Sequence, residues 1–160
     1  MKKLVIIAAV GKNRELGYKN SLIWHFKEDL KSFKDRTMNH YILMGKNTFN
    51  SLPHNLKGRK YLVLSKSLED GEGYRLFRDK KSFLEFYDNI DEDVYVIGGS
   101  SIYEEFILDA QELILTEIDD SFPEASVYFP KFKKENYEKE SLGEYREDDI
   151  DYRIIRYIKK

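Results

Sequence analysis

Short apolar runs alternate along most of this chain with stretches of helical periodicity, and no other feature restricts the fold as strongly. The strand-like runs span residues 4–10, 41–44, 61–65, 74–77, 94–97 and 113–118, and the helical stretches span residues 29–37, 47–51, 80–87 and 101–108. Neighbouring parallel strands need long crossover connections, which are usually helices. The alternation therefore predicts an α/β fold with a mostly parallel sheet.

The pattern changes after residue 118. Residues 137–145 and 152–158 resemble two further strands, separated by a polar turn at residues 146–151. Two strands joined so closely pair as an antiparallel hairpin. With this hairpin, the sequence predicts a single domain over residues 1–160, in which a central, mixed, mostly parallel eight-stranded sheet is flanked by about four helices.

Composition narrows the possible functions. Hydrophobic residues make up 41% of the chain and charged residues 35%, as in globular proteins, and a net charge of −2 gives no basic field for nucleic acid. Because cysteine is absent, disulfides, thiolate metal sites and a cysteine nucleophile are excluded. The apolar run at residues 4–10 is too short to span a membrane. We expect a cytoplasmic protein that binds neither membranes nor nucleic acid.

Metal binding is not expected from the sequence. His25, His40 and His54 show no ligand spacing and are interpreted as loop or surface residues. The acidic groups at residues 91–93 and 147–149 fall in predicted turns, where carboxylates are usually solvated.

One acid interrupts an apolar helix face just after the only tryptophan, Trp24. At helical spacing Asp29 shares one side with Phe26, Leu30 and Phe33. A carboxylate that faces a core needs a partner, because burying a lone charge is costly. Asp29 is therefore a candidate to bind a cationic or amidine-like ligand. The alternative is a local cap or ion pair near the helix start.

Two strand-to-helix junctions have features that suit phosphate groups. Residues 94–97 run into Gly98-Gly99 and then into a helix, and residues 41–44 run into Gly45-Lys46. Glycines let a ligand approach the backbone, and free amides at a helix start bind anions. Neither a complete P-loop nor a G-x-G-x-x-G fingerprint is present, so simple turns are the alternative. Two such junctions in one sheet favour a dinucleotide.

At this point the sequence resembles the dihydrofolate reductase family, in order from residue 4 to residue 130. The resemblance is carried by Ile7-Ala8-Ala9, Leu16-Gly17, Leu22-Ile23-Trp24, Asp29-Leu30, Leu43-Met44-Gly45-Lys46-Asn47-Thr48-Phe49, Leu56-Lys57-Gly58-Arg59-Lys60, Val63-Leu64-Ser65, Ile97-Gly98-Gly99-Ser100-Ser101-Ile102-Tyr103, Leu115-Thr116 and Phe129-Pro130. It implies a reductase of one-carbon metabolism that converts 7,8-dihydrofolate to tetrahydrofolate by hydride transfer to pterin C6, with protonation of N5 by solvent.

The resemblance implies a substrate site around Asp29, whose two oxygens would pair with pterin N3 and the 2-amino group. Thr116 would support that carboxylate, and Trp24 would hold an ordered water beside it. Dihydrofolate and antifolates would also contact Ile7, Leu30, Phe33, Lys34, Leu52, His54, Leu56, Arg59, Ile97 and Tyr103. Arg59 would form a charged fork with the glutamate carboxylate of the substrate. A solvated surface arginine is the alternative.

The resemblance also implies NADPH as the cofactor. The residues expected to bind it are Ala9, Leu16, Gly17, Asn20, Ser21, Gly45, Lys46, Asn47, Thr48, Ser65, Lys66, Arg78, Gly98, Gly99, Ser100, Ser101, Ile102 and Tyr103. Lys46, Ser65 and Lys66 would surround the 2′-phosphate, and a cis peptide bond would join the two glycines at 98 and 99. Residues 11–23 would close over the nicotinamide and exclude water. We expect a monomer.

Three positions depart from the family pattern. Ile23 replaces a usual proline before the tryptophan, so loop closure is expected to be looser. Ser126-Val127 replaces a frequent Asp-Thr pair, which weakens the case for a hydrogen-bonded contact of that loop with residues 11–23 or with the cofactor. Ser101 replaces an arginine of some members, which leaves selectivity for the 2′-phosphate to Lys46 and Lys66.

Two rival interpretations compete with this one. A reductase of the riboflavin pathway shares the fold and cofactor, but does not require Asp29, Thr116 and Arg59 at these places. A nucleotide-binding module without catalysis would be favoured by loss of Asp29, which is present. Dihydrofolate reductase is therefore the preferred prediction.

Overall fold

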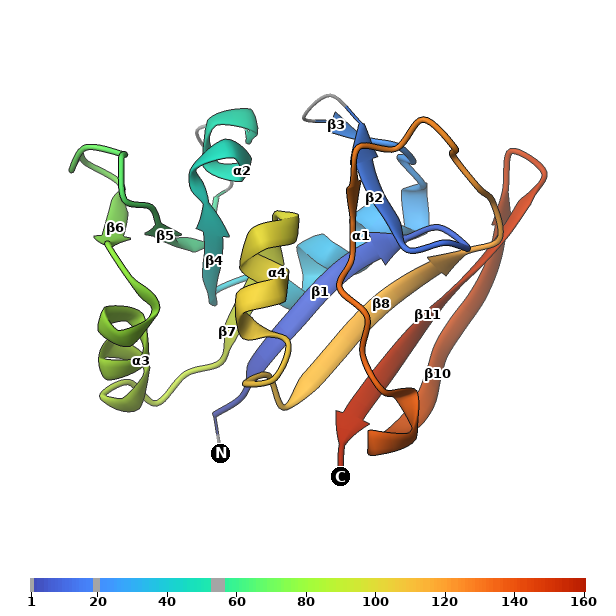
Figure 1. Ribbon diagram of the computed structural model, residues 1–160. Helices are drawn as coiled ribbons and strands as arrows, with labels where there is room; N and C mark the ends of the chain where they lie inside the picture. The colour runs from blue at the N-terminus through green and yellow to red at the C-terminus, as the bar shows by residue number, and fades with distance from the viewer. Residues whose placement is uncertain (1, 19–20, 53–56) are drawn as a thin grey trace.

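The computed structural model describes residues 2–18, 21–52 and 57–160. Within these ranges the main element is an eight-stranded sheet with the order β10-β11-β8-β1-β7-β4-β5-β6 (Figure 1). Its strands are β1 (Leu4–Val10), β4 (Tyr41–Gly45), β5 (Lys60–Leu64), β6 (Tyr74–Phe77), β7 (Val94–Gly98), β8 (Glu112–Ile118), β10 (Tyr137–Glu147) and β11 (Ile150–Lys159). All neighbours from β8 to β6 are parallel, whereas β11 runs antiparallel to both β8 and β10. The predicted mixed sheet with its C-terminal hairpin is confirmed.

Four α-helices flank the sheet in the described ranges. They are α1 (Lys27–Thr37), α2 (Lys46–Ser51), α3 (Lys80–Asp88) and α4 (Ser100–Phe106), and a short 3-10 helix, η1, spans Lys134–Asn136. Helices α1 and α4 lie on opposite sides of the central strands (Figure 1). The predicted helices are all present, with ends shifted by one or two residues, as helix ends commonly are. None of the described helices has the length and apolarity that a membrane crossing requires.

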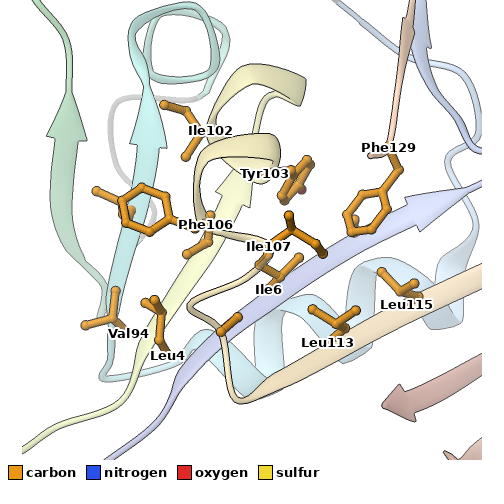
Figure 2. Packing of buried hydrophobic residues seen from close by; sticks show 14 of the residues in the cluster. Leu4, Ile6, Val94, Ile102, Tyr103, Phe106, Ile107, Leu113, Leu115 and Phe129 are labelled. Atoms are coloured by element: carbon orange, nitrogen blue, oxygen red, sulfur yellow. The ribbon is translucent and has the colours of Figure 1, made fainter. Parts of the chain in front are cut away.

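Alternation along β1 divides the core between the two faces of the sheet. Leu4 and Ile6 belong to the cluster beneath α4, whereas Val5 and Ile7 belong to a cluster on the other face that includes Phe33 of α1. Successive strand residues point to opposite faces, so a strand covered on both sides is apolar throughout. Figure 2 shows the α4 side of this core, with Leu4, Ile6, Val94, Ile102, Tyr103, Phe106, Ile107, Leu113, Leu115 and Phe129 labelled.

A second, smaller sheet has the order β3-β2-β9 and is not predicted by the sequence. It contains β2 (Glu15–Tyr18), β3 (Ser21–Leu22) and β9 (Val127–Tyr128), so the segment expected to be a polar loop is largely a hairpin. Gly17 pairs with Val127, and the Ser126 amide donates to the Gly17 carbonyl at 3.0 Å. Ser126-Val127 had weakened the case for this contact, but the contact is present, because the backbone amide of Ser126 makes it and the Ser126 hydroxyl adds a bond at 3.4 Å.

The turn of the C-terminal hairpin is shorter than predicted. Pairing continues to Glu147 and Ile150, which leaves only Asp148 and Asp149 between the strands. Both have positive φ, 54° and 62°. These values match a type I′ turn, whose twist suits a hairpin and which aspartate tolerates better than most residues. The polar run therefore marks the turn but not its length.

Candidate active site

Asp29 lies in the first turn of α1 and is bonded to the central sheet. Its carboxylate accepts a 2.5 Å hydrogen bond from the hydroxyl of Thr116, a buried residue of β8. The helix start at Phe26 has no side-chain cap, so Asp29 does not act as a local cap. Burial raises the pKa of the Asp29 carboxyl above its ordinary value, and the Thr116 hydrogen bond opposes that rise.

This carboxylate can still accept bonds from a ligand. A carboxylate offers about four lone-pair positions, and the hydroxyl of Thr116 takes one of those on Asp29. A group with two parallel N–H donors would bind both oxygens, which is among the strongest pairings available to a carboxylate. The site therefore favours an amidine-like heterocycle over a neutral apolar ligand.

Arg59 lies beside the other end of α1. Its guanidinium donates to the hydroxyl of Thr37 at 3.2 Å and to the carbonyl oxygens of Lys34 at 3.3 Å and Lys57 at 2.9 Å. A guanidinium has five N–H donors, so three bonds to the protein orient it and leave donors for a carboxylate. Along the helix axis, Asp29 and Thr37 are about 12 Å apart.

The apolar residues predicted to sandwich the substrate gather on one face of the sheet. Ile7, Phe33, Leu52 and Ile97 all belong to or pack against one cluster. Leu30, in the same helix turn as Asp29, is 45% exposed. A large apolar side chain left open beside a polar anchor is typical of a ligand site. Lys34 is exposed, and the predicted residues His54 and Leu56 lie outside the described residues.

Tyr103 of α4 is buried in the core cluster beneath that helix. Its hydroxyl donates to the Ile7 carbonyl at 2.8 Å, and its ring lies 5.2 Å from that of Phe129 (Figure 2). Burial raises the pKa of Tyr103 strongly, and the nearby charge of Asp29 adds to the rise. Tyr103 therefore stays protonated and bonds to the middle of β1.

The two glycine junctions lie side by side. Strands β4 and β7 are neighbours, with Met44 opposite Gly98, so α2 and α4 begin at the same edge of the sheet. Neither helix start, at Gly45 or at Gly99, has a side-chain cap. Their first amides are therefore available to an anion. The peptide bond between Gly98 and Gly99 is cis, as the resemblance implied.

Gly45 and Gly98, which lie at the starts of α2 and α4, are packed so closely that a larger side chain would crowd neighbouring residues. A Cβ on Gly45 would lie 3.1 Å from Ile102, and one on Gly98 would lie 3.3 Å from the Tyr103 hydroxyl. Gly98 also has a φ of 123°, which other residues rarely adopt. The side chains of Ile102 and Tyr103, predicted to contact the cofactor, are packed in the core beneath α4 (Figure 2). They pack against Gly45 and Gly98 from the core side.

Basic residues gather beside the C-terminal ends of β4 and β5. The Lys46 ammonium donates to the Ser67 hydroxyl at 3.3 Å, and Arg78 donates to the Ser65 carbonyl at 3.1 Å. Lys66, between these serines, is exposed. Three cations and two hydroxyls in one place suit a phosphate group, so the residues predicted for the 2′-phosphate are brought together.

The other predicted cofactor residues fall at several places. Ala9 is opposite Thr116 in the sheet register, and Leu16 is buried in the core. Gly17 lies in β2; Asn47, Thr48, Ser100 and Ser101 occupy the first turns of α2 and α4. Ser21 is described only as backbone of β3, and Asn20 lies outside the described residues.

Trp24 is buried, and its indole N–H donates to the Asp120 carboxylate at 3.0 Å. The resemblance implied instead that this N–H binds an ordered water beside Asp29. Because an indole has a single N–H donor, a water bound there would have to replace Asp120. In this structure Trp24, which directly follows residues 11–23, is therefore bonded to the loop after β8.

Sequence reasoning missed Asp120, and it missed the burial of Glu15, which the resemblance placed only in a loop, residues 15–21, that lines the NADPH site. Asp119-Asp120 resembles a solvated acidic pair, and Glu15 occupies a polar segment with no sign of burial. Glu15 is nevertheless only 1% exposed. Neither residue has a local signal of this kind, because the Trp24 indole lies 96 residues from Asp120 and the Phe122 amide lies 107 residues from Glu15.

An enzyme that acts on a nitrogen heterocycle with a phosphorylated nucleotide needs anion-binding amides at a sheet edge and a carboxylate within reach of them. This fold supplies uncapped helix starts at one end of the sheet and a carboxylate bonded to a central strand, which are features of an α/β enzyme that binds a nucleotide. A model of the family described as "Dihydrofolate reductase" matches residues 3–159. The chain belongs to the dihydrofolate reductase family. It is an NADP-dependent oxidoreductase that reduces dihydrofolate to tetrahydrofolate.

Dihydrofolate reductases of several organisms are similar to this chain. That of Buchnera aphidicola subsp. Acyrthosiphon pisum (strain APS) is 37% identical over 135 residues, covering 84% of this chain and 83% of the relative. That of Bacillus subtilis (strain 168) is 34% identical over 159 residues, covering 96% and 93%. Dihydrofolate reductase HdrB of Haloferax volcanii is 29% identical over 168 residues, covering 99% and 84%. The riboflavin-pathway and non-catalytic interpretations are set aside.

Proposed function

We propose that Asp29 binds the pterin ring of dihydrofolate and that Thr116 orients its carboxylate. The supporting observation is a half-buried carboxylate beside the sheet whose protein partner is a single hydroxyl donor among the described residues. Its negative charge would favour a protonated pterin. Antifolates with an amidine-like ring would compete for the same oxygens. NADPH oxidation with dihydrofolate as the added substrate, in wild type and Asp29 variants, tests this assignment.

The substrate would lie along α1, with the pterin at Asp29 and the glutamate tail at Arg59. The separation of about 12 Å along the helix and the apolar residues between the two ends support this orientation. Leu30 and Phe33 would contact the middle of the molecule. One side of one helix would thus hold both polar ends of the substrate.

Water is the proposed proton donor to pterin N5. Tyr103, a buried phenol near Asp29, donates a hydrogen bond to the Ile7 carbonyl and has a raised pKa, so it is a poor proton donor. Both oxygens of Asp29 would be bonded to the pterin ring. The side chains would therefore orient the substrate and exclude bulk water rather than transfer the proton themselves.

NADPH would supply the hydride from its nicotinamide. The amides at the starts of α2 and α4 would hold its diphosphate, and the glycines at 45, 98 and 99 would let it approach the backbone. Lys46 and Lys66, with Ser65 and Arg78, would hold the 2′-phosphate. Residues of β2 would cover the nicotinamide end.

The basic residues predict a preference for NADPH over NADH. Replacing Lys46 and Lys66 together by alanine should lower the ratio of kcat/KM values for the two cofactors by at least about tenfold, because each lysine makes a charge-assisted bond. Lys133→Ala, which removes an exposed lysine far along the chain, should leave the ratio unchanged. A ratio near one in wild type would show that these lysines do not recognise the 2′-phosphate.

Trp24 should report ligand binding through its fluorescence. It lies between β3 and α1 and is the only tryptophan, so the signal has a single source. We expect saturating NADPH and folate to change its emission, since closing the segment at residues 11–23 alters the surroundings of the indole. Unchanged emission would argue that this segment does not border the site.

We also propose that the chain acts as a monomeric, single-domain enzyme of the cytoplasm. One continuous sheet carries the proposed positions for both the substrate and the cofactor, which supports a site complete within one chain. Light scattering of the purified protein, with and without NADPH, tests the monomer.

A further inference from the structure

We propose that a cavity between residues 129–134 and the strands β1, β8 and β11 is a second binding site, for a small organic phosphate with an aromatic or aliphatic body. The cavity has a volume of about 670 Å³, within the usual range for small-molecule sites. None of its lining residues is among those predicted to contact dihydrofolate or NADPH. The proposal is therefore independent of the proposed function.

The cavity lies on the face of the sheet opposite Asp29. Successive strand residues point to opposite faces, so Thr116, which bonds to Asp29, and Glu117, which lines the cavity, face opposite sides. Leu115, another lining residue, belongs to the core cluster beneath α4. In Figure 1 the segment from β9 to η1 passes over β8 on this same side. The sheet would therefore separate a ligand in the cavity from the pterin.

Aromatic and aliphatic side chains form the inner wall of the cavity. Phe129 and Phe132 lie edge to face with their ring centroids 6.0 Å apart, and the Phe132 ring lies 5.4 Å from that of Tyr157. Phe129 is buried, whereas Phe132 is partly buried and packs against the core cluster. With Val10 and Leu115, the two phenylalanines provide an apolar surface whose position the core fixes.

Positive charge predominates among the polar residues of the lining. Five of the lining residues are cations, namely Lys12, Arg14, Lys131, Lys134 and Arg153. The lining acid Glu117 forms an ion pair with Arg153 at 3.4 Å. The lining acid Asp119 forms one with Lys12 at 3.3 Å. These two acids neutralise two of the cations, so three positive charges remain.

The three remaining cations suit a ligand with two negative charges. Within the part of the chain that the structure describes, Arg14, Lys131 and Lys134 form no ion pair with an acid. The Arg14 guanidinium donates to the Phe129 carbonyl, which orients it and leaves other N–H groups for a ligand. A phosphate monoester carries a charge of about −1.5 to −2 at pH 7 and three acceptor oxygens. It would relieve the repulsion between the cations and bond to each.

Titration of the enzyme with 1-naphthyl phosphate, followed by NMR at the backbone amides of Glu117 and Phe132, tests the site directly. We expect both amide signals to shift and to saturate with the same Kd. Inorganic phosphate has the charge without the apolar body, and 1-naphthol has the body without the charge, so each should bind at least about tenfold more weakly. No saturable shift at these amides, or equal affinity for inorganic phosphate, would overturn the proposal.

Replacing Lys131 and Lys134 together by alanine should raise the Kd for 1-naphthyl phosphate by about tenfold, because two charge-assisted contacts are lost. Both side chains are exposed, so the fold should tolerate the change. Lys133→Ala is the matched control, since Lys133 is exposed and lies between them in the chain but is not among the residues that line the cavity. The control should leave the Kd unchanged. An equal rise in both variants would mean diffuse attraction to a basic segment and would overturn the proposal.

A second pair of substitutions distinguishes the cavity from the proposed position of the NADPH 2′-phosphate. Replacing Lys46 and Lys66 together by alanine should leave the Kd measured at the Phe132 amide unchanged, because neither lysine lines the cavity. A rise equal to that of the Lys131 and Lys134 variant would mean that the probe binds at the cofactor position instead, and would overturn the proposal.

Discussion

Asp29→Asn is expected to lower kcat/KM for dihydrofolate at neutral pH by about 10- to 100-fold, which corresponds to the loss of one charge-assisted pairing. The amide retains one acceptor oxygen but brings an N–H₂ group against a ligand donor and carries no negative charge. Initial rates of NADPH oxidation measure the effect. Asp35→Asn changes an exposed acid of the same helix and should leave kcat/KM unchanged. Turnover of the Asp29 variant within a few-fold of wild type would refute the assignment.

The same substitution should increase stability at neutral pH. Burial raises the folded-state pKa of Asp29 above its ordinary value of 3.8, so ionisation costs more in the folded protein than in the unfolded chain. The stability linked to this group is complete below pH 3.8 and is lost as the pH rises through the raised folded-state pKa. Asparagine does not ionise and loses nothing in this range.

Urea denaturation of wild type and Asp29→Asn at several pH values measures this effect. The variant's advantage in free energy of unfolding should grow as the pH rises above the ordinary carboxyl pKa and then level off. An Asp29→Asn enzyme that is both inactive and more stable would indicate a residue kept for binding rather than for folding. A variant less stable at every pH would mean that the bond from Thr116 outweighs burial.

Arg59→Ala is expected to raise the KM for dihydrofolate by about 10- to 100-fold and to lower kcat far less, because a contact remote from hydride transfer acts about equally in the ground and transition states. Arg59→Lys should restore little, since lysine cannot form the planar two-bond fork. Steady-state kinetics over a range of dihydrofolate concentrations separates the two parameters.

A substrate without the glutamate tail is the control for Arg59. Arg59 also bonds to Thr37 and the Lys34 carbonyl, so its removal could disturb the end of α1 as well as the tail contact. If Arg59→Ala removes only the contact with the tail, the KM for the tail-less substrate should be nearly the same in wild type and variant. An unchanged KM for dihydrofolate itself would instead leave Arg59 as a residue that only supports the helix.

Local sequence pattern was enough to predict the main sheet, its hairpin, Asp29 and the two glycine junctions, whereas Thr116 and Arg59 were implied only by the family resemblance. Apolar runs with crossover helices between them allow few arrangements, so the eight-stranded sheet followed from their order. Asp29 was recognisable because a carboxylate on an apolar helix face is a local conflict. The glycines at 98 and 99 were recognisable from their place between a strand and a helix. Each of these signals lies within about a dozen neighbouring residues.

The contacts that hold the segment at residues 11–22 could be found only in the folded molecule. Its small sheet depends on β9, the buried carboxylate of Glu15 depends on the Phe122 amide, and the indole of Trp24 depends on Asp120. Each partner comes from a loop about a hundred residues later, and an acid looks the same in sequence whether water or a distant amide binds it. Such contacts form only after the sheet has brought the two loops together, because local periodicity carries no information about the partners of polar groups.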